Sequence, residues 1–140
     1  MNVIPAVHRF LEERPTLTLG TIRKDGSPQA SVVWYLWDGS SFLVSTVPTT
    51  AKWQNLLRDP RCSLCVEEPG SGQMVVAYGQ ATLDDGDVRA RTRDLVAKYY
   101  DDAADTDAHM ERIFRTNDRV LIEVVPDRLI PRRLEPETRT

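Results

Sequence analysis

The chain has 140 residues, enough for one domain and too few for two full hydrophobic cores, and its 41% apolar and 28% charged residues are typical of a chain that folds on its own. The net charge of −3 argues against nucleic-acid binding through bulk positive charge; no apolar run approaches the roughly 20 residues needed to cross a bilayer, and the N-terminus lacks the features of a signal peptide. We therefore expect one domain over residues 1–140 that works in the cytoplasm without nucleic-acid or membrane partners.

The first half of the chain predicts a short helix followed by three strands. Apolar residues at helical spacing predict a helix over residues 3–13, and Pro15 ends it. An alternating stretch of apolar and β-branched residues predicts a strand over 16–22, and further strands are predicted over 29–37 and 41–46. Each of the two connections contains an Asp-Gly pair, which is a strong hairpin signal. We therefore expect these three strands to form an antiparallel meander.

The strand predicted over 29–37 is apolar on both of its faces. One face carries Val32 and Trp34, and the other carries Val33 and Tyr35. A sheet with one solvated face would instead alternate apolar and polar residues. We therefore expect a helix, a second subunit, or both to cover the outer face of this strand.

The second half of the chain predicts three helices and three strands. The helices are expected over 51–57, where Thr49 or Thr50 can act as the N-cap, from about 84 to 99, and over 108–115 after an acidic linker at 101–107. The strands are expected over 61–67, 73–83 (with a bulge at Gly79) and 119–125. Six strands with inserted helices predict a mainly β fold with flanking helices, closed into a small antiparallel barrel.

Two cysteines, Cys62 and Cys65, form a C-x-x-C string inside the strand predicted over 61–67. Residues three apart on a strand point to opposite faces, so the two thiols diverge. The chain has no second cysteine pair, and His8 and His109 lie far away in the sequence. We therefore expect two ordinary buried thiols and no metal site.

The stretch from Thr46 to Leu64 carries the most specific pattern in the chain. A strand ends in Thr, a Thr-rich turn leads to Lys52, and a short helix runs into a strand that starts with Asp-Pro-Arg. This order resembles the flavin-binding segment of the pyridoxamine 5'-phosphate oxidase-like split β-barrel superfamily. The likeness extends upstream and into the last strand, and it covers about residues 14–130.

The resemblance implies a six-stranded antiparallel split β-barrel that is homodimeric, with the cofactor between the two subunits. Backbone groups of the second strand contact the cofactor ring in this family, whereas hydroxyls, helix amides and an ammonium are suited to its phosphate. The cofactor-binding residues expected on these grounds are Val32, Val33, Trp34, Thr46, Thr49, Thr50, Ala51, Lys52 and Gln73. If no cofactor binds, Thr49 or Thr50 is simply the N-cap of the helix, Lys52 is a solvated surface lysine, and Trp34 takes part in aromatic packing.

Several positions differ from the vitamin B6 oxidases of the family. Ser31 and Ala51 stand where those enzymes carry arginines, and Leu36 stands where they carry a substrate-binding lysine, so vitamin B6 oxidation is not expected. The shorter chain, with its Val-Trp-Tyr and Asp-Pro-Arg motifs, is more similar to the branch that binds the deazaflavin coenzyme F420. Thr50 stands where some of those proteins carry an arginine, which keeps FMN as the alternative cofactor.

The resemblance implies an oxidoreductase that transfers a hydride between coenzyme F420 and a small conjugated organic substrate. The alternatives are an FMN-dependent oxidoreductase of the same family and a non-enzymatic module that holds a flavin or another ligand. Catalytic residues stay unassigned: His8 and His109 are interpreted as surface residues, Tyr35 and Tyr78 are weak candidates for a proton donor, and solvent can supply the proton.

Overall fold

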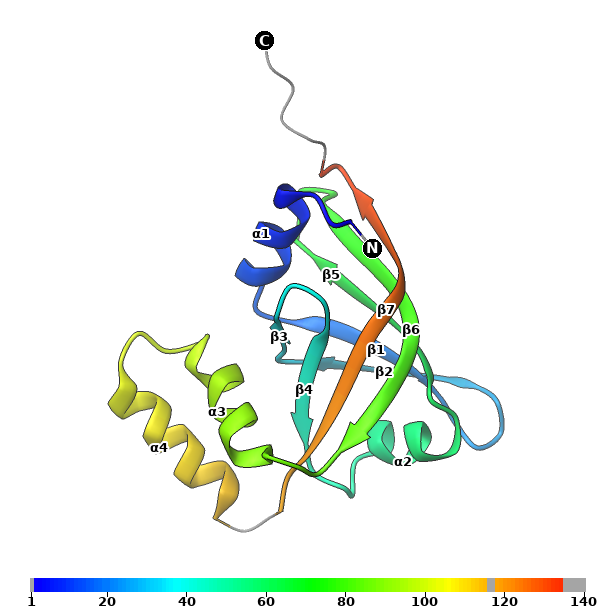
Figure 1. Cartoon of the computed structure of the whole chain (residues 1–140). Coiled ribbons are helices and arrows are strands. Elements are labelled where there is room, and N and C mark those ends of the chain that lie inside the picture. The colour runs from blue at the N-terminus through cyan, green and yellow to red at the C-terminus, as the bar shows by residue number, and fades with distance from the viewer. Residues whose placement is uncertain (1, 116–117, 135–140) are drawn as a thin grey trace.

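The computed structural model describes residues 2–115 and 118–134, which form one antiparallel sheet of seven strands with four helices around it (Figure 1). The strands are β1 Leu17–Ile22, β2 Pro28–Val33, β3 Leu36–Trp37, β4 Phe42–Thr46, β5 Arg61–Glu67, β6 Met74–Asp84 and β7 Val120–Arg132. The helices are α1 Pro5–Glu13, α2 Ala51–Arg58, α3 Val88–Ala97 and α4 Ala103–Phe114. The predicted mainly β class and the antiparallel pairing are confirmed.

The predicted number of six strands is wrong, because the strand expected over 29–37 is broken in two. The break falls at Trp34 and Tyr35. There the amide of Tyr35 donates to the hydroxyl of Tyr99 (2.9 Å) instead of to a neighbouring strand. The hydroxyl of Tyr99, just after α3, therefore replaces a neighbouring strand as the partner of this amide, and β2 and β3 are separate strands.

The predicted three-strand meander is also wrong. β1 pairs with β2 and β3 pairs with β4, but the sheet order is β2-β1-β5-β6-β7-β4-β3, so β2 and β3 lie at opposite edges. Only Trp34 and Tyr35 separate these two edges in the chain, and so short a connection spans at most about 11 Å. The sheet therefore curls until its edges approach each other, which gives the barrel-like shape in Figure 1.

The concave side of the curled sheet encloses the hydrophobic core. Its buried residues include Tyr35 from the break between β2 and β3 and, from the strands, Leu17, Leu19, Phe42, Val44, Val66, Val75, Ile122 and Val124. Helix α1 covers one end of this core with Val7, Phe10 and Leu11, and α2 covers the other (Figure 1). The side-chain amide Nδ2 of Asn55 in α2 donates to the buried Thr21 hydroxyl (3.1 Å), which connects this helix to β1.

Helices α3 and α4 pack against each other beside β4 (Figure 1). Leu95, Val96 and Met110 form their shared core, and Leu36 of β3 packs against it. A helix pair thus covers part of the apolar outer face, as the sequence predicted. The linker expected over 101–107 is wrong, because α4 already begins at Ala103, after Asp102 caps it.

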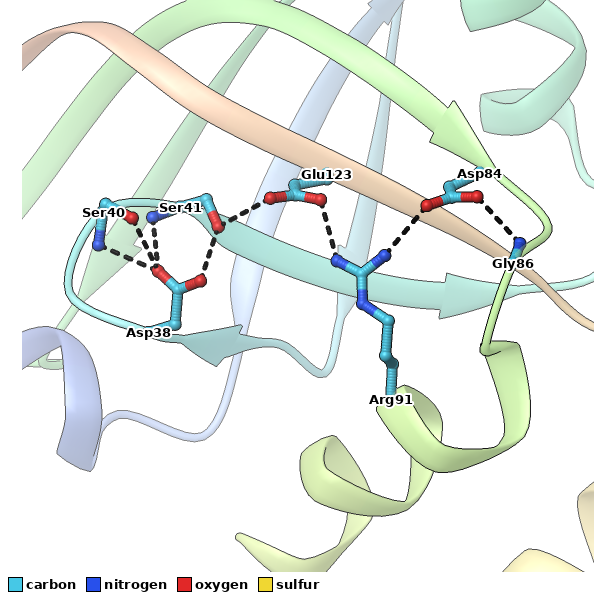
Figure 2. A network of polar contacts seen from close by, with 7 residues as sticks. All are labelled: Asp38, Ser40, Ser41, Asp84, Gly86, Arg91 and Glu123. Atoms are coloured by element: carbon cyan, nitrogen blue, oxygen red, sulfur yellow. Dashed lines mark hydrogen bonds and ion pairs between the residues drawn. The ribbon is translucent and has the colours of Figure 1, made fainter.

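A chain of polar contacts fixes α3 to the sheet, as Figure 2 shows. Arg91 of α3 forms ion pairs with Asp84 (3.1 Å) at the end of β6 and with Glu123 (2.7 Å) in β7. The other carboxylate oxygen of Glu123 lies 3.1 Å from the hydroxyl of Ser41, which also lies 2.9 Å from the Asp38 carboxylate. One arginine therefore links the helix pair to three parts of the barrel.

Strand β7 is longer than the strand predicted over 119–125, because it continues along β6 to Arg132. The pairing shifts register between Tyr78 and Gly79, which confirms the predicted bulge. A Cβ atom on Gly79 would lie only 2.9 Å from the carbonyl oxygen of Val125. Glycine is therefore required for the close approach of the two strands at this bend.

The two cysteines point to opposite sides of β5, as predicted, and they form no disulfide. Cys62 is buried and Cys65 is half-buried on the outer side, so the prediction of two buried thiols is correct only for Cys62. Burial raises the pKa of the Cys62 thiol to about 11 and also raises the pKa of Cys65. Both side chains are therefore protonated thiols at neutral pH, not reactive thiolates.

Candidate functional site

The residues predicted to hold a phosphate lie where β4 ends and α2 begins. Thr46 is buried at the end of β4, while Thr49 and Ala51 are exposed. Thr50 is the N-cap of α2, but its hydroxyl lies 3.0 Å from the Val47 carbonyl and 3.2 Å from the Thr46 hydroxyl. The Thr50 side chain does not cap the first-turn amides of α2, so within the described part of the chain these amides are available to an anion.

Arg119, which the sequence analysis missed, lies beside these residues. β4 pairs with β7 in a register that sets Thr46 opposite Val120, so the residue that precedes β7 lies next to the end of β4. The Nε atom of Arg119 donates to the hydroxyl of Ser45 and Nη2 donates to the Ser45 carbonyl, each at 3.0 Å. These partners are 74 positions apart, so no local pattern in the sequence reveals the contact.

Lys52 and Arg119 are two neighbouring cations that have no counter-ion among the residues the structure describes. Burial lowers the pKa of Lys52, and the charge of Arg119 lowers it further. Within residues 2–115 and 118–134, no carboxylate forms an ion pair with either side chain. Two like charges held together favour an anionic group between them. We call Thr46, Thr50, Lys52 and Arg119 the anion site.

The strand predicted to contact a cofactor ring exposes one face and buries the other. Val32 is 70% exposed and Trp34 is 37% exposed, whereas Val33 packs against the core. β2 is an edge strand that pairs only with β1, so the backbone groups on its other side have no strand partner. The Trp34 ring stacks on Tyr99, with 3.9 Å between the ring centroids and 11° between the planes. The structure thus offers unpaired backbone and a fixed aromatic ring at one place.

A cavity of about 210 Å³ lies between the helix pair and the barrel, beside the anion site. Its wall consists of Trp34, Ser45 and Arg119 together with three residues of α3 and two of α4. We call this cavity the aromatic pocket. Trp34 and Arg119 line the same cavity, and the charge of Arg119 also lowers the pKa of Lys52. Arg119 therefore links Trp34 to the predicted phosphate-binding residue Lys52.

Gln73 lies away from the other predicted site residues. It precedes β6 in the turn that follows β5, and α2 precedes β5, so the length of β5 separates Gln73 from the anion site. Its side-chain amide faces the carbonyl of Arg133, at 3.4 Å. Within one chain, therefore, the structure does not place Gln73 beside Lys52 or Trp34.

The candidate proton donors lie in four different surroundings. The Tyr35 hydroxyl donates to the carbonyl of Leu11 inside the core, and burial raises its pKa, so Tyr35 is not placed to deliver a proton. Tyr78 is exposed on the outside of the sheet, and His8 accepts a hydrogen bond from a core tryptophan. His109 lines the aromatic pocket, which corrects its interpretation as a surface residue.

Two further features bear on partners and metals. None of the helices in the described part of the chain is long and apolar enough to span a membrane. No group of three or more His, Cys, Asp or Glu side chains in the described ranges is arranged to hold a metal ion.

A curled antiparallel sheet of seven strands with flanking helices has the architecture of a split β-barrel. The chain belongs to the pyridoxamine 5'-phosphate oxidase family, whose family model matches residues 3–131. This assignment confirms the family resemblance inferred from the sequence.

Three solved structures illustrate the range of similar proteins. An F420 reductase is 25% identical, with a TM-score of 0.67 over 86% of this chain and 93% of that chain. A conserved hypothetical protein from Mycobacterium tuberculosis is 23% identical, with a TM-score of 0.78 over 100% of this chain and 92% of that chain. The haem storage protein HutZ from Vibrio cholerae is 18% identical, with a TM-score of 0.71 over 94% of this chain and 95% of that chain. The latter two are similar to this chain in fold.

Proposed function

We propose that the protein is an oxidoreductase that transfers a hydride between coenzyme F420 and a small conjugated organic substrate. The observation that carries this proposal is the pair of neighbouring cations, Lys52 and Arg119, which have no described counter-ion and lie at the uncapped start of α2. The similarity to an F420 reductase supports F420 as the cofactor, and FMN is the alternative.

The residues of the anion site fit the phosphate group that both cofactors carry. Lys52 and Arg119 supply positive charge and the α2 amides supply N–H donors, whereas the Thr46 and Thr50 hydroxyls would have to release their present acceptors before donating to a phosphate. The open backbone edge of β2 at Val32, Val33 and Trp34 is suited to a flat, polar-edged ring. When bound, the flavin or deazaflavin ring supplies the hydride chemistry, while the protein binds, orients and excludes water.

We also propose that the protein works as a homodimer, with the cofactor between the subunits. An uncharged row crosses the outer side of five strands: Val32, Thr18, Cys65, Val76 and Ile130 are neighbours in the strand register. Val32 and Thr18 are exposed and the other three are half-buried, and a partly exposed row without charges is suited to an interaction surface. The row begins at Val32, so a second subunit seated on it would also enclose the ring-binding edge of β2.

A non-enzymatic ligand-binding module is the second candidate. It is favoured by the composition of the anion site, because none of its four residues Thr46, Thr50, Lys52 and Arg119 is a histidine, cysteine or carboxylate that commonly acts as a general acid or base. The fold similarity to a haem storage protein agrees with this alternative.

Cofactor binding and turnover tests separate these functions. Purified protein is titrated with F420 and with FMN while cofactor fluorescence is followed, and the loaded protein is then assayed with reduced F420 or NADPH against quinones and unsaturated ketones. The proposal expects tight F420 binding and turnover of at least one acceptor. Binding without turnover supports the module, tighter FMN binding with turnover supports the alternative cofactor, and no binding of either cofactor refutes the proposal.

A further inference from the structure

The described lining of the aromatic pocket contains hydrogen-bond donors and no carboxylate. Arg119 uses Nε and Nη2 on Ser45, and its Nη1 group has no partner among the described residues. The Ser45 and Thr92 hydroxyls lie 2.9 Å apart, and Ser45 Oγ already accepts from Arg119. Two hydroxyl hydrogens share this one contact, so one hydrogen is left over. Because Thr92 is fully buried, that hydrogen is available to a ligand when Thr92 donates to Ser45 and Ser45 keeps the free hydrogen. A ligand must therefore offer acceptor oxygens.

His109 adds a third donor. Its Nδ1 atom lies 3.1 Å from Nη2 of Arg112 and 2.9 Å from the Tyr100 hydroxyl. An arginine can only donate, so Nδ1 is an acceptor and the neutral ring carries its hydrogen on Nε2. Burial and the charges of Arg112 and Arg119 lower the pKa of His109, which keeps the ring neutral at physiological pH.

The remaining wall is apolar. Leu95, Val96 and Ile113 line it, and the Trp34 ring is held by stacking on Tyr99 and on His109, whose ring centroid lies 5.2 Å away. The cavity measures about 210 Å³. An apolar protein cavity of about 150 Å³ is large enough to bind benzene, so this pocket accommodates one ring with a polar substituent.

We propose that the aromatic pocket binds a planar single-ring carboxylate of the benzoate class. The carboxylate accepts from Arg119 and from the Ser45–Thr92 hydroxyl pair, the ring lies in the apolar part of the pocket, and His109 Nε2–H donates to an oxygen substituent on the ring. The identification of this ligand as the substrate rests on the proposed function. Binding of the benzoate to the pocket does not rest on the proposed function, because all the groups that would contact it are side chains of this one chain and no cofactor is needed.

The test uses the full-length protein without cofactor. Benzoate and 4-hydroxybenzoate are titrated by calorimetry or by protein-observed NMR, with benzyl alcohol and inorganic phosphate as comparison ligands. We expect saturable carboxylate binding, at least about tenfold weaker binding of benzyl alcohol, and a loss of about tenfold or more in Arg119→Gln. His109→Phe is expected to weaken the binding of 4-hydroxybenzoate more than the binding of benzoate. The matched control Arg128→Gln, on the exposed outer side of β7, is expected to bind as the wild type does.

A second variant covers the case in which Arg119→Gln fails to fold. Ile113→Trp keeps every donor but fills the pocket, and it is expected to abolish benzoate binding. The proposal is overturned by no carboxylate binding at millimolar concentration or by binding that neither variant weakens. Arg119 also belongs to the anion site, so Arg119→Gln is expected to change both benzoate and cofactor binding. Ile113→Trp leaves the anion site intact, so FMN and F420 titrations of that variant report on the cofactor proposal separately from benzoate.

Discussion

Replacement of Lys52 tests the anion site directly. In the cofactor-free protein this ammonium is half-buried and lies close enough to Arg119 for the charge of that arginine to lower its pKa. Lys52→Gln removes this repulsion, so the free energy of unfolding of the cofactor-free protein should stay unchanged or rise slightly. A loss of stability would instead indicate that Lys52 forms favourable contacts in the free protein.

The same change should weaken the binding of a phosphorylated cofactor. A hydrogen bond to a charged group contributes about 1.5–3 kcal/mol, which corresponds to a roughly 10- to 150-fold change in affinity. Because Lys52 is only half-buried, solvent screens part of this interaction, and we expect the lower half of that range.

The assay compares each cofactor with its counterpart that lacks the phosphate. Fluorescence titrations with FMN and riboflavin, and with F420 and its phosphate-free deazaflavin, isolate the contribution of the phosphate group. Lys52→Gln should weaken the binding of FMN and F420 and leave the binding of riboflavin and the phosphate-free deazaflavin unchanged. Lys24→Gln, in the exposed β1–β2 turn, serves as the matched control. Equal losses for FMN and riboflavin, or equal behaviour of the two lysine variants, would refute the location of the anion site.

Three further predictions concern stability, pH and assembly. Arg91→Ala removes both ion pairs that fix α3 to the sheet, and we expect denaturant unfolding to show a loss of about 1–3 kcal/mol. Burial lowers the pKa of Lys98 to about 8 from its ordinary 10.5, so the unfolded chain binds more protons between these values. The free energy of unfolding should therefore rise with pH from about 8 towards 10, and Lys98→Met, measured by urea titration, should flatten that rise. Val32→Asp places a charge in the uncharged outer row, and light scattering should show the dimer dissociating; an unchanged dimer would show that the interface lies elsewhere.

The elements that local sequence patterns predicted well are those whose geometry depends on neighbouring residues. The hairpin between β1 and β2 follows from the Asp-Gly turn at Asp25 and Gly26, where Gly26 adopts a positive φ of 87°. Helix α2 and its N-cap at Thr50 follow from the Thr-rich turn and the apolar spacing behind it. In both cases, the information lies within about ten residues of the chain.

The features that the sequence analysis missed depend on contacts between distant segments. The break between β2 and β3 requires the Tyr99 hydroxyl, which is 64 positions from Tyr35. The place of Arg119 depends on the pairing of β4 with β7, and the role of His109 depends on how α4 packs against α3. A pattern of apolar residues specifies that a segment is a strand or a helix, but it does not specify which of several similar partners that segment meets.

The charge distribution argues that the anion site is kept for an external group. The chain carries 21 acidic residues and 18 basic ones, so carboxylates are not scarce. Arg61 and Arg91 each form ion pairs with nearby carboxylates, as a chain selected only for stability would arrange. Lys52 and Arg119 stand together without such a partner in the described structure, although burial makes their charges costly. Buried charges without an opposite charge are expected mainly where function requires them, and an anionic ligand would neutralise this pair.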